Sequence, residues 1–249
     1  MNQYQRHIDV DNLWSTIIAE TKAVVAETPL LTSFYDRNIL QHHSYDAALA
    51  YVLAEKMADT PDNTNQWQEC FLGLMGEHKS IGQAASHDLL CQLRNNAAIK
   101  DHYQPLLYFG GYQALQCYRL AHICWHHQQA ALASYIQSKV VSLYGVDIHP
   151  AAKIGAGIFM DHAVGIVIGE TAVVEDDVTL FQNVTLGGTG KGSGDRHPKV
   201  RRGAFVGSGA QIFGNIEIGA HAKVAGGAVV VKPVLPGTTV VGPAAKTLV

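Results

Sequence analysis

The C-terminal part of the chain places an aliphatic residue at every sixth position, and this period limits the possible folds more than any other feature. A period of six fits neither an α-helix nor the alternation of a plain strand. It is typical of a solenoid of short parallel strands, in which three hexads form a triangular coil of about eighteen residues. We therefore predict a parallel β-helix whose axis is filled by two series of residues: Ile148, Ile154, Met160, Ile166, Ala172, Val178 and Val184, then Val200, Val206, Ile212, Ile218, Val224 and Val230.

Residues 190–199, with the sequence GKGSGDRHPK, interrupt this period. A solenoid corner sets no limit on loop length, so an insertion there can project outward and build a site. A plain surface loop is the alternative interpretation. Ionisable side chains and a proline, at 195–199, follow a glycine-rich stretch, and this arrangement favours a functional loop.

The two parts of the chain differ in composition. Of the 24 glycines, 19 lie from Gly145 onward, whereas all three tryptophans, all ten tyrosines and all four cysteines lie before it. We predict a boundary near residues 140–146 and an α+β fold class. An all-helical domain over residues 1–143 precedes a β-helix over residues 144–249, from which the loop 190–199 protrudes.

Helix signals occur throughout the first part. Asp11 is predicted to cap a helix that ends before Pro29, and Ser44 to cap another. A long helix is expected after Pro105, and a loop near residue 59 separates a helix pair. Few chemically active groups accompany these helices, so we expect this domain to mediate assembly.

Charge and hydropathy exclude several classes of partner. The formal net charge is -3 and no run of five like charges occurs, which argues against nucleic acid and anionic membranes. The N-terminus lacks the apolar run of a signal peptide, and no stretch of about eighteen apolar residues exists. The four cysteines form no CxxC pair and are predicted to be reduced core thiols. We expect a cytoplasmic protein.

Thirteen histidines raise the question of a metal site. His122 and His126 share a helix face and His127 adjoins them, but no carboxylate accompanies them at helical spacing. His42 and His43 form a second pair. The solenoid histidines are isolated, without the pair five positions apart that carbonic-anhydrase solenoids use. The sequence therefore predicts no metal site.

An acid–base pair is a stronger candidate. Asp147 and the dipeptide Asp161-His162 lie about fourteen residues apart, on neighbouring faces of one coil. A histidine oriented by a carboxylate is suited to take a proton from a hydroxyl. The alternative is that Asp147 caps the domain transition and His162 is an exposed corner residue.

Three segments resemble bacterial serine O-acetyltransferases: residues 105–119, 146–174 and 183–200. Hexapeptide repeats alone indicate only the superfamily of left-handed β-helix acyltransferases, whereas the combination DIHP, DHA, GETA and GGTGK…GDRHPK is far more specific. The resemblance covers nearly the whole chain. It implies a left-handed β-helix and transfer of acetyl from acetyl-CoA to L-serine, in cysteine biosynthesis. Acetyl-CoA would be a co-substrate, with no permanently bound cofactor.

The resemblance also implies residue roles. His162 would be the general base and Asp147 would orient it. Asp161 would bind the substrate ammonium, and Arg196, with His197 beside it, would bind the carboxylate. A planar guanidinium suits a carboxylate and an anionic Asp suits an ammonium.

The acetyl-CoA groove of the family lies between adjacent solenoids, so the resemblance implies a homotrimer, or a hexamer formed as a dimer of trimers. Cofactor-binding positions would be Gly188, Thr189, Ser208 and Lys223. L-cysteine is expected as a feedback inhibitor, because it resembles serine. No cysteine lies in the solenoid part, which favours direct attack of the hydroxyl on the thioester.

Three positions depart from the family pattern. Val164 replaces the Thr of DHATG, and Asn96 falls where the family has the Asp of its RDPA segment. The sequence stops at residues 246–249, soon after the last hexad, so we expect no complex with cysteine synthase through a C-terminal tail.

Two alternatives remain open at this point. One is an O-acetyltransferase that acts on another hydroxy-amino acid or a sugar, although Asp161 and Arg196 favour a zwitterionic acceptor. The other is a non-catalytic regulator of cysteine synthase.

Overall fold

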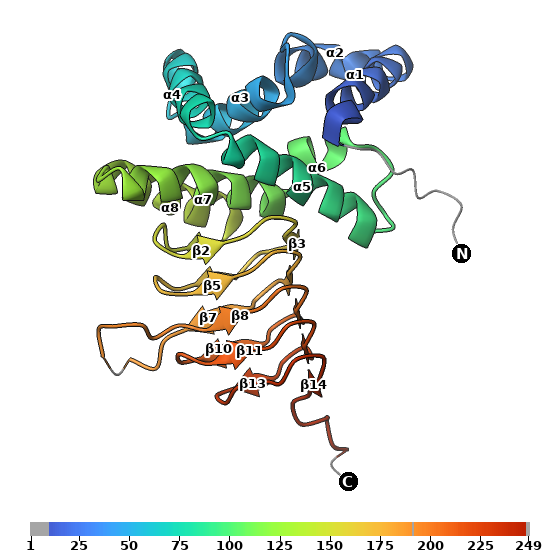
Figure 1. Ribbon diagram of the computed structural model, residues 1–249. Coiled ribbons are helices and arrows are strands. Elements are labelled where there is room, and N and C mark those ends of the chain that lie inside the picture. Colours follow the sequence, from blue (N-terminus) through green and yellow to red (C-terminus); the bar gives the residue numbers. More distant parts are fainter. Residues whose placement is uncertain (1–9, 191, 248–249) are drawn as a thin grey trace.

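A layer of helices covers one end of a β-solenoid in the computed structural model, which describes residues 10–190 and 192–247 (Figure 1). The parts of the predicted domains and loop that fall on residues 1–9, 191 and 248–249 lie outside the described residues. The predicted fold class is confirmed: a helical N-terminal part is followed by a parallel β-helix. Across the described ranges, no helix combines the length and the apolar character that a membrane span requires.

The helical part runs to Tyr144, where Gly145 ends the last helix in a left-handed conformation. Three short turns of other helix types, η1–η3, connect some of the α-helices. The elements are α1 (Val10–Glu27), η1 (Pro29–Leu31), α2 (Thr32–Tyr35), η2 (Asp36–Leu40), α3 (Tyr45–Met57), η3 (Pro61–Asn63), α4 (Thr64–Glu77), α5 (Ser80–Asn95), α6 (Tyr103–Tyr108), α7 (Gly110–His126) and α8 (Ala130–Tyr144).

Most predicted helix boundaries are confirmed. The Ser44 hydroxyl accepts a hydrogen bond from the Ala47 amide at 3.2 Å, which caps α3, and α1 ends before Pro29. The prediction for Asp11 is wrong, because α1 already includes Val10 and Asp11 lies inside its first turn. The long helix expected after Pro105 is confirmed as α7, and the short helix α6 precedes it.

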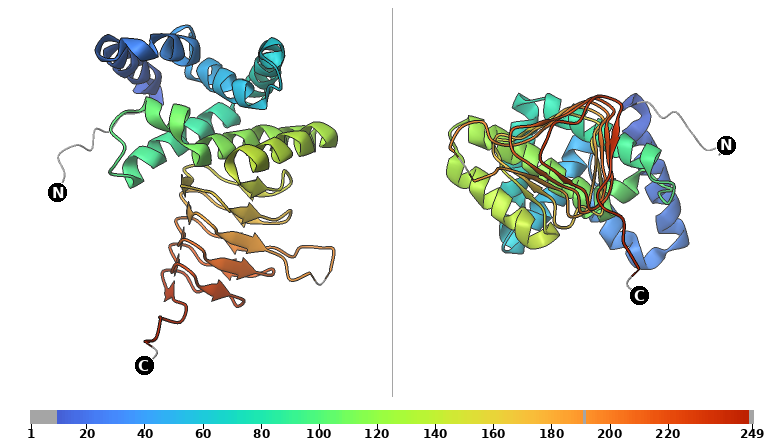
Figure 2. Two further views of the ribbon diagram at one scale, coloured as in Figure 1. Left: turned by 180° about the vertical axis from the view of Figure 1, so that it is seen from behind. Right: turned by 90° about the horizontal axis from the view of Figure 1, so that it is seen from below.

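The solenoid consists of three parallel sheets (Figure 2), and each of the first four coils contributes one strand to each sheet, whereas the last coil contributes strands to two of them. The sheet orders are β1-β4-β7-β10-β13, β2-β5-β8-β11 and β3-β6-β9-β12-β14. The strands are β1 (Asp147–Ile148), β2 (Lys153–Ile154), β3 (Phe159–Asp161), β4 (Val167–Ile168), β5 (Val173–Val174), β6 (Thr179–Phe181), β7 (Thr185–Gly187), β8 (Lys199–Val200), β9 (Phe205–Val206), β10 (Gln211–Phe213), β11 (Glu217–Ile218), β12 (Lys223–Val224), β13 (Val229–Val230) and β14 (Thr239–Val240).

Twelve of the thirteen hexad residues are buried, and Ile154 is half-buried. The prediction of a uniform eighteen-residue coil is wrong for the first coil. Ile148 pairs with Ile168, so this coil has 20 residues, whereas Ile168 pairs with Leu186 after 18. The two extra residues fall in the turn after β3, and the chain therefore leaves the regular coil path there.

Side chains of α7 bind the open backbone edge of the first coil. The Tyr118 hydroxyl donates to the Ala152 carbonyl, and His122 Nδ1 donates to the Pro150 carbonyl at 2.6 Å. This contact uses a ring nitrogen of His122 that the sequence had left available as a metal ligand. Helical side chains thus donate the hydrogen bonds that these carbonyls would otherwise receive from a preceding coil.

A buried ion pair lies at the centre of this junction. Asp88 of α5 accepts two hydrogen bonds from Arg119 of α7, from Nη2 at 2.6 Å and from Nε at 3.1 Å. Arg119 also donates to the Gly155 carbonyl at 2.6 Å, and the Ile158 amide donates to Asp88 at 2.9 Å. Burial raises the pKa of Asp88, and the adjacent guanidinium opposes that effect. Two helices and one coil therefore share a single charged cluster.

Arg119→Met should lower the melting temperature by about 10 °C, because a buried carboxylate without its partner costs about 3–5 kcal/mol. Differential scanning calorimetry measures the effect. Arg202→Met is the control, since Arg202 pairs with Asp176 on the surface, and its loss should change the melting temperature by less than about 3 °C. Equal shifts for the two variants would contradict the assignment.

Candidate active site

The turn after β3 holds His162 in an unusual backbone conformation. His162 and Ala163 have φ of 56° and 64°, and they are two successive non-glycine residues in the left-handed region. The amide of Ala163 donates to the Asp161 carbonyl at 2.6 Å, and that of Val164 to the His162 carbonyl at 2.9 Å. These are two consecutive three-residue turns, a strained arrangement. This backbone conformation directs the imidazole of His162 outward, and the side chain is 72% exposed.

Helix α7 packs directly beneath this turn. A Cβ at Gly111 would lie 2.7 Å from the Met160 carbonyl oxygen and 2.8 Å from the Cβ of Ala163. Only glycine therefore lets the helix approach so closely.

Two carboxylates lie at this corner of the solenoid. Asp161 Oδ2 is 3.6 Å from His162 Nε2. Asp147 begins β1 next to the same corner, and its Oδ1 accepts a hydrogen bond from Gln137 Nε2 of α8 at 2.7 Å. The structure therefore brings Asp161 closest to His162, and it records no hydrogen bond between Asp147 and His162, both of which it describes.

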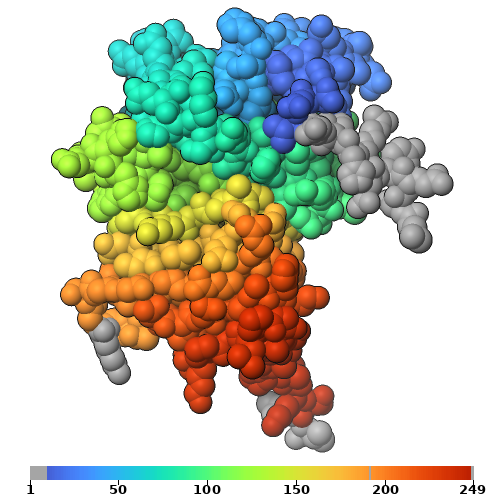
Figure 3. All heavy atoms as spheres, in the orientation of Figure 1, coloured from blue at the N-terminus to red at the C-terminus, as the bar shows by residue number. Residues whose placement is uncertain are grey.

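A second group of polar residues lies where the protruding loop returns to the solenoid. Arg196 Nη2 forms an ion pair with Glu170 Oε2 at 2.6 Å, and this hydrogen bond lowers the pKa of Glu170. The Thr171 hydroxyl accepts hydrogen bonds from the amides of Arg196 and His197 at 3.0 and 3.1 Å. The loop base is therefore fixed on the corner between β4 and β5, and the loop itself projects from the side of the molecule (Figure 3).

The His197 ring is buried and has a defined donor. Its Nδ1 accepts from the Thr171 amide at 3.1 Å and lies 2.8 Å from the Thr171 hydroxyl. Burial lowers the pKa of His197, and the nearby Arg196 charge adds to the effect. Because Nδ1 accepts from the Thr171 amide, Nε2 is the ring nitrogen that can donate to an anion. A Cβ at Gly169 would lie 2.1 Å from this ring, so glycine makes room for it.

These two groups occupy different corners of the triangular solenoid. The turn with His162 lies where strands of the sheet β1-β4-β7-β10-β13 begin, because it joins β3 to β4. The loop with Arg196 lies where strands of the same sheet end, because it follows β7. One face of the solenoid separates them, roughly 15–20 Å at about 3.3 Å per residue. A single chain therefore does not bring the two predicted halves of the site together.

The predicted cofactor positions divide in the same way. Gly188 and Thr189 follow β7 at the corner of the loop, whereas Ser208 lies at the corner of His162, two coils further on. Lys223 begins β12 and is exposed on the adjoining sheet. Asn96 ends α5, and its Oδ1 accepts from the Ala98 amide at 3.0 Å.

The two main clefts, of about 470 and 410 Å³, lie between α5 and the third corner, and none of the predicted site residues lines them.

Sequence reasoning missed Gln137, Glu170 and Thr171. Glu170 and Thr171 belong to the GETA segment, which carried the resemblance, so a signal for them was present. The contact of Gln137 with Asp147 depends on how α8 meets the first coil, for which the sequence pattern offers no signal.

The chain is similar to known proteins over almost its whole length. The family model for the serine acetyltransferase N-terminal region matches residues 13–117. The serine acetyltransferase of Salmonella typhimurium is 44% identical over 238 residues, which cover 96% of this chain and 87% of that protein.

Three solved structures extend the comparison. A serine acetyltransferase in complex with cysteine has a TM-score of 0.91 at 42% identity, covering 97% of this chain and 100% of that one. The Brucella abortus enzyme in complex with coenzyme A has a TM-score of 0.91 at 39% identity, covering 96% and 95%. The Neisseria gonorrhoeae enzyme in complex with serine has a TM-score of 0.91 at 38% identity, covering 99% and 100%.

Gly111→Ala should lower the melting temperature by about 3–10 °C, because the added methyl group overpacks the contact beneath the His162 turn. Gly73→Ala in α4 is the matched control. A Cβ there meets nothing within 4 Å, so helix propensity should raise the melting temperature by about 1–4 °C. A Gly111→Ala variant as stable as Gly73→Ala would refute the close approach.

Proposed function

This chain belongs to the serine acetyltransferase family, and we propose which of its residues perform the reaction. The enzyme transfers the acetyl group of acetyl-CoA to the hydroxyl of L-serine, which yields O-acetylserine and CoA. Acetyl-CoA is a co-substrate that binds and leaves in each turnover.

His162 is the general base in this proposal. Its ring takes the hydroxyl proton of serine as the oxygen attacks the thioester carbonyl, the C–S bond then breaks, and the proton passes to the departing CoA sulfur. The exposed, strained turn that presents the ring supports this role, because strain is retained where it serves a function. A glycine-corner amide is suited to stabilise the oxyanion.

The two carboxylates have different roles. We assign Asp147 to orient the imidazole and to stabilise its charged form. Its own position is held by Gln137 at 2.7 Å, which supports a fixed geometry. We assign Asp161 to the substrate ammonium, since it lies within 4 Å of His162 and would place the amino acid beside the base.

Arg196 and His197 form the carboxylate site. In this single chain Arg196 pairs with Glu170, so serine binding would exchange or share that partner. His197 would add a neutral Nε2–H donor whose direction is set by Thr171. A guanidinium with an adjacent imidazole donor suits a carboxylate better than it suits a sugar hydroxyl, which supports a zwitterionic acceptor.

The active site is formed between two chains, and one observation carries this proposal: His162 and Arg196 lie at different corners of the solenoid. A three-fold ring would set the loop corner of one chain against the His162 corner of the next. Gly188 and Thr189 of one chain would then face Ser208 of its neighbour, with Lys223 nearby for the phosphates of CoA. We propose a trimer on this basis, and a hexamer if the helical parts pair two trimers.

L-cysteine would compete with serine at this site. It carries the same ammonium and carboxylate groups, so Asp161, Arg196 and His197 would bind it in the same way. Asn96 removes one negative charge that the family places near the ammonium, and we expect weaker rather than abolished binding of both amino acids.

His162→Ala should lower turnover at least about a hundredfold, the usual size of a general-base contribution. Asp147→Asn should lower it less, because it misorients the base without removing it. His221→Ala is the matched control, since His221 also occupies a left-handed corner, with φ of 57°, and should retain the wild-type rate within about twofold. Steady-state kinetics measure the turnover of each variant, and circular dichroism checks that it is folded. An active His162→Ala variant would exclude His162 as the general base.

Co-expression of His162→Ala with Arg196→Ala should restore activity that neither variant has alone. If each site combines one corner from each of two chains, random mixing leaves about a quarter of the sites intact. The measurement is the specific activity of the purified mixed oligomer, with its mass from light scattering. No recovery, or an active monomer, would show that the site lies within one chain.

Thr171→Val should raise the KM for serine about tenfold, because the amides of Arg196 and His197 lose the hydroxyl that accepts their hydrogen bonds and Nδ1 of His197 keeps only the backbone amide as a partner. The inhibition constant of cysteine should rise by the same factor, while kcat changes little. Thr171→Ser should restore both values. A fall in kcat without a change in KM would assign Thr171 to another role.

A further inference from the structure

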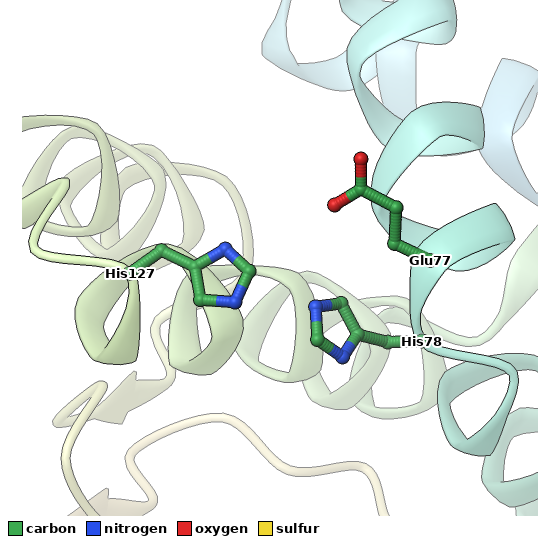
Figure 4. Close-up of side chains that lie close together, drawn as sticks. All are labelled: Glu77, His78 and His127. Atoms are coloured by element: carbon green, nitrogen blue, oxygen red, sulfur yellow. The ribbon is translucent and has the colours of Figure 1, made fainter.

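Two helix ends that are distant in the sequence bring Glu77, His78 and His127 together (Figure 4). Each residue offers one ligand atom, and these atoms all lie within 4.8 Å of one another. Glu77 and His78 come from the end of α4, and His127 follows the last residue of α7. The cluster lies outside the proposed active site, on the helical part of the chain.

The imidazoles of His78 and His127 lie against each other. Their ring centroids are 4.9 Å apart and their planes are inclined by 55°, so the rings are not stacked. Nε2 of His78 is buried and has no hydrogen-bond partner. A buried ring nitrogen without a partner is costly, which indicates that the site accommodates a further ligand.

The local charges favour a cation. His78 and His127 are the C-caps of α4 and α7, and helix C-termini carry partial negative charge. Glu77 adds a full negative charge and forms no ion pair with any residue that the structure describes. The charge of the neighbouring Lys79 acts on Asp46, whose pKa it lowers against the effect of burial.

We propose that Glu77, His78 and His127 bind one Zn²⁺ ion. Two imidazole nitrogens and one carboxylate are a common zinc donor set that leaves a fourth position for water. Ligand atoms around tetrahedral zinc lie roughly 3–3.5 Å apart, so small side-chain rotations close the present separations. The ion would join the end of α4 to the end of α7 and so stiffen the helical layer.

The sequence could not reveal this site, because it places His127 next to His122 and His126 and far from Glu77 and His78. His122 bonds to Pro150, and His126 packs on His122 with centroids 4.4 Å apart. His127 is the one of the three that turns to α4, where Glu77 supplies the carboxylate that no neighbour on its own helix offers.

Zinc titration of the untagged, chelator-treated enzyme tests the proposal. Isothermal calorimetry should give one high-affinity Zn²⁺ ion per chain, and Co²⁺ should develop the visible absorption of a low-symmetry site. Saturation should raise the melting temperature by about 5 °C, since an ion that binds only the folded state stabilises it.

Variants at exposed positions keep the test independent of folding. His127→Ala and Glu77→Gln should each weaken Zn²⁺ binding at least tenfold and abolish the thermal shift. His126→Ala, which removes the adjacent exposed histidine, should retain both within twofold. The metal-free and zinc-loaded enzymes should transfer acetyl at the same rate. A failure of the zinc proposal is therefore distinguishable from a failure of the proposed active site. Absence of a stoichiometric site, or equal losses for His126→Ala and His127→Ala, would overturn the proposal.

Discussion

The buried ion pair between Asp88 and Arg119 is the interaction on which the arrangement of this molecule depends. It joins α5 to α7, and through Gly155 and Ile158 it joins both helices to the first coil. Breaking it would leave a charge in a dry interior, so the helical layer and the solenoid hold a fixed relative position. That position sets Gly111 beneath the His162 turn and Gln137 beside Asp147.

Both candidate halves of the active site are departures from the repeat. In the regular coil the backbone groups of each strand pair with the strands of the neighbouring coils. Two extra residues in the first coil create the strained turn of His162, and the insertion after β7 contains Arg196 and His197. The repeat supplies rigidity, and its two irregularities supply chemistry on an immobile support.

Local and periodic features were predictable from the sequence. The hexads gave the solenoid and its buried residues, Ser44 gave a cap, and the motifs gave the family. Features that depend on how parts meet were not predictable in the same way. The close approach of Gly111 to the His162 turn follows from how α7 meets the first coil, and the meeting of His78 with His127 follows from the packing of α4 on α7. Neither leaves a periodic signal, because the partners are far apart in the chain.

The helical cover of the first coil also closes one end of the solenoid. β1, β2 and β3 are the terminal strands of their sheets, and their backbone groups would otherwise be open to another strand. Tyr118, Arg119 and His122 occupy carbonyls of that coil instead. Coils of one solenoid are built to stack on coils of the same shape, so an uncovered end is a template for head-to-tail filament growth. The helices therefore block the addition of a further coil at this end of the solenoid.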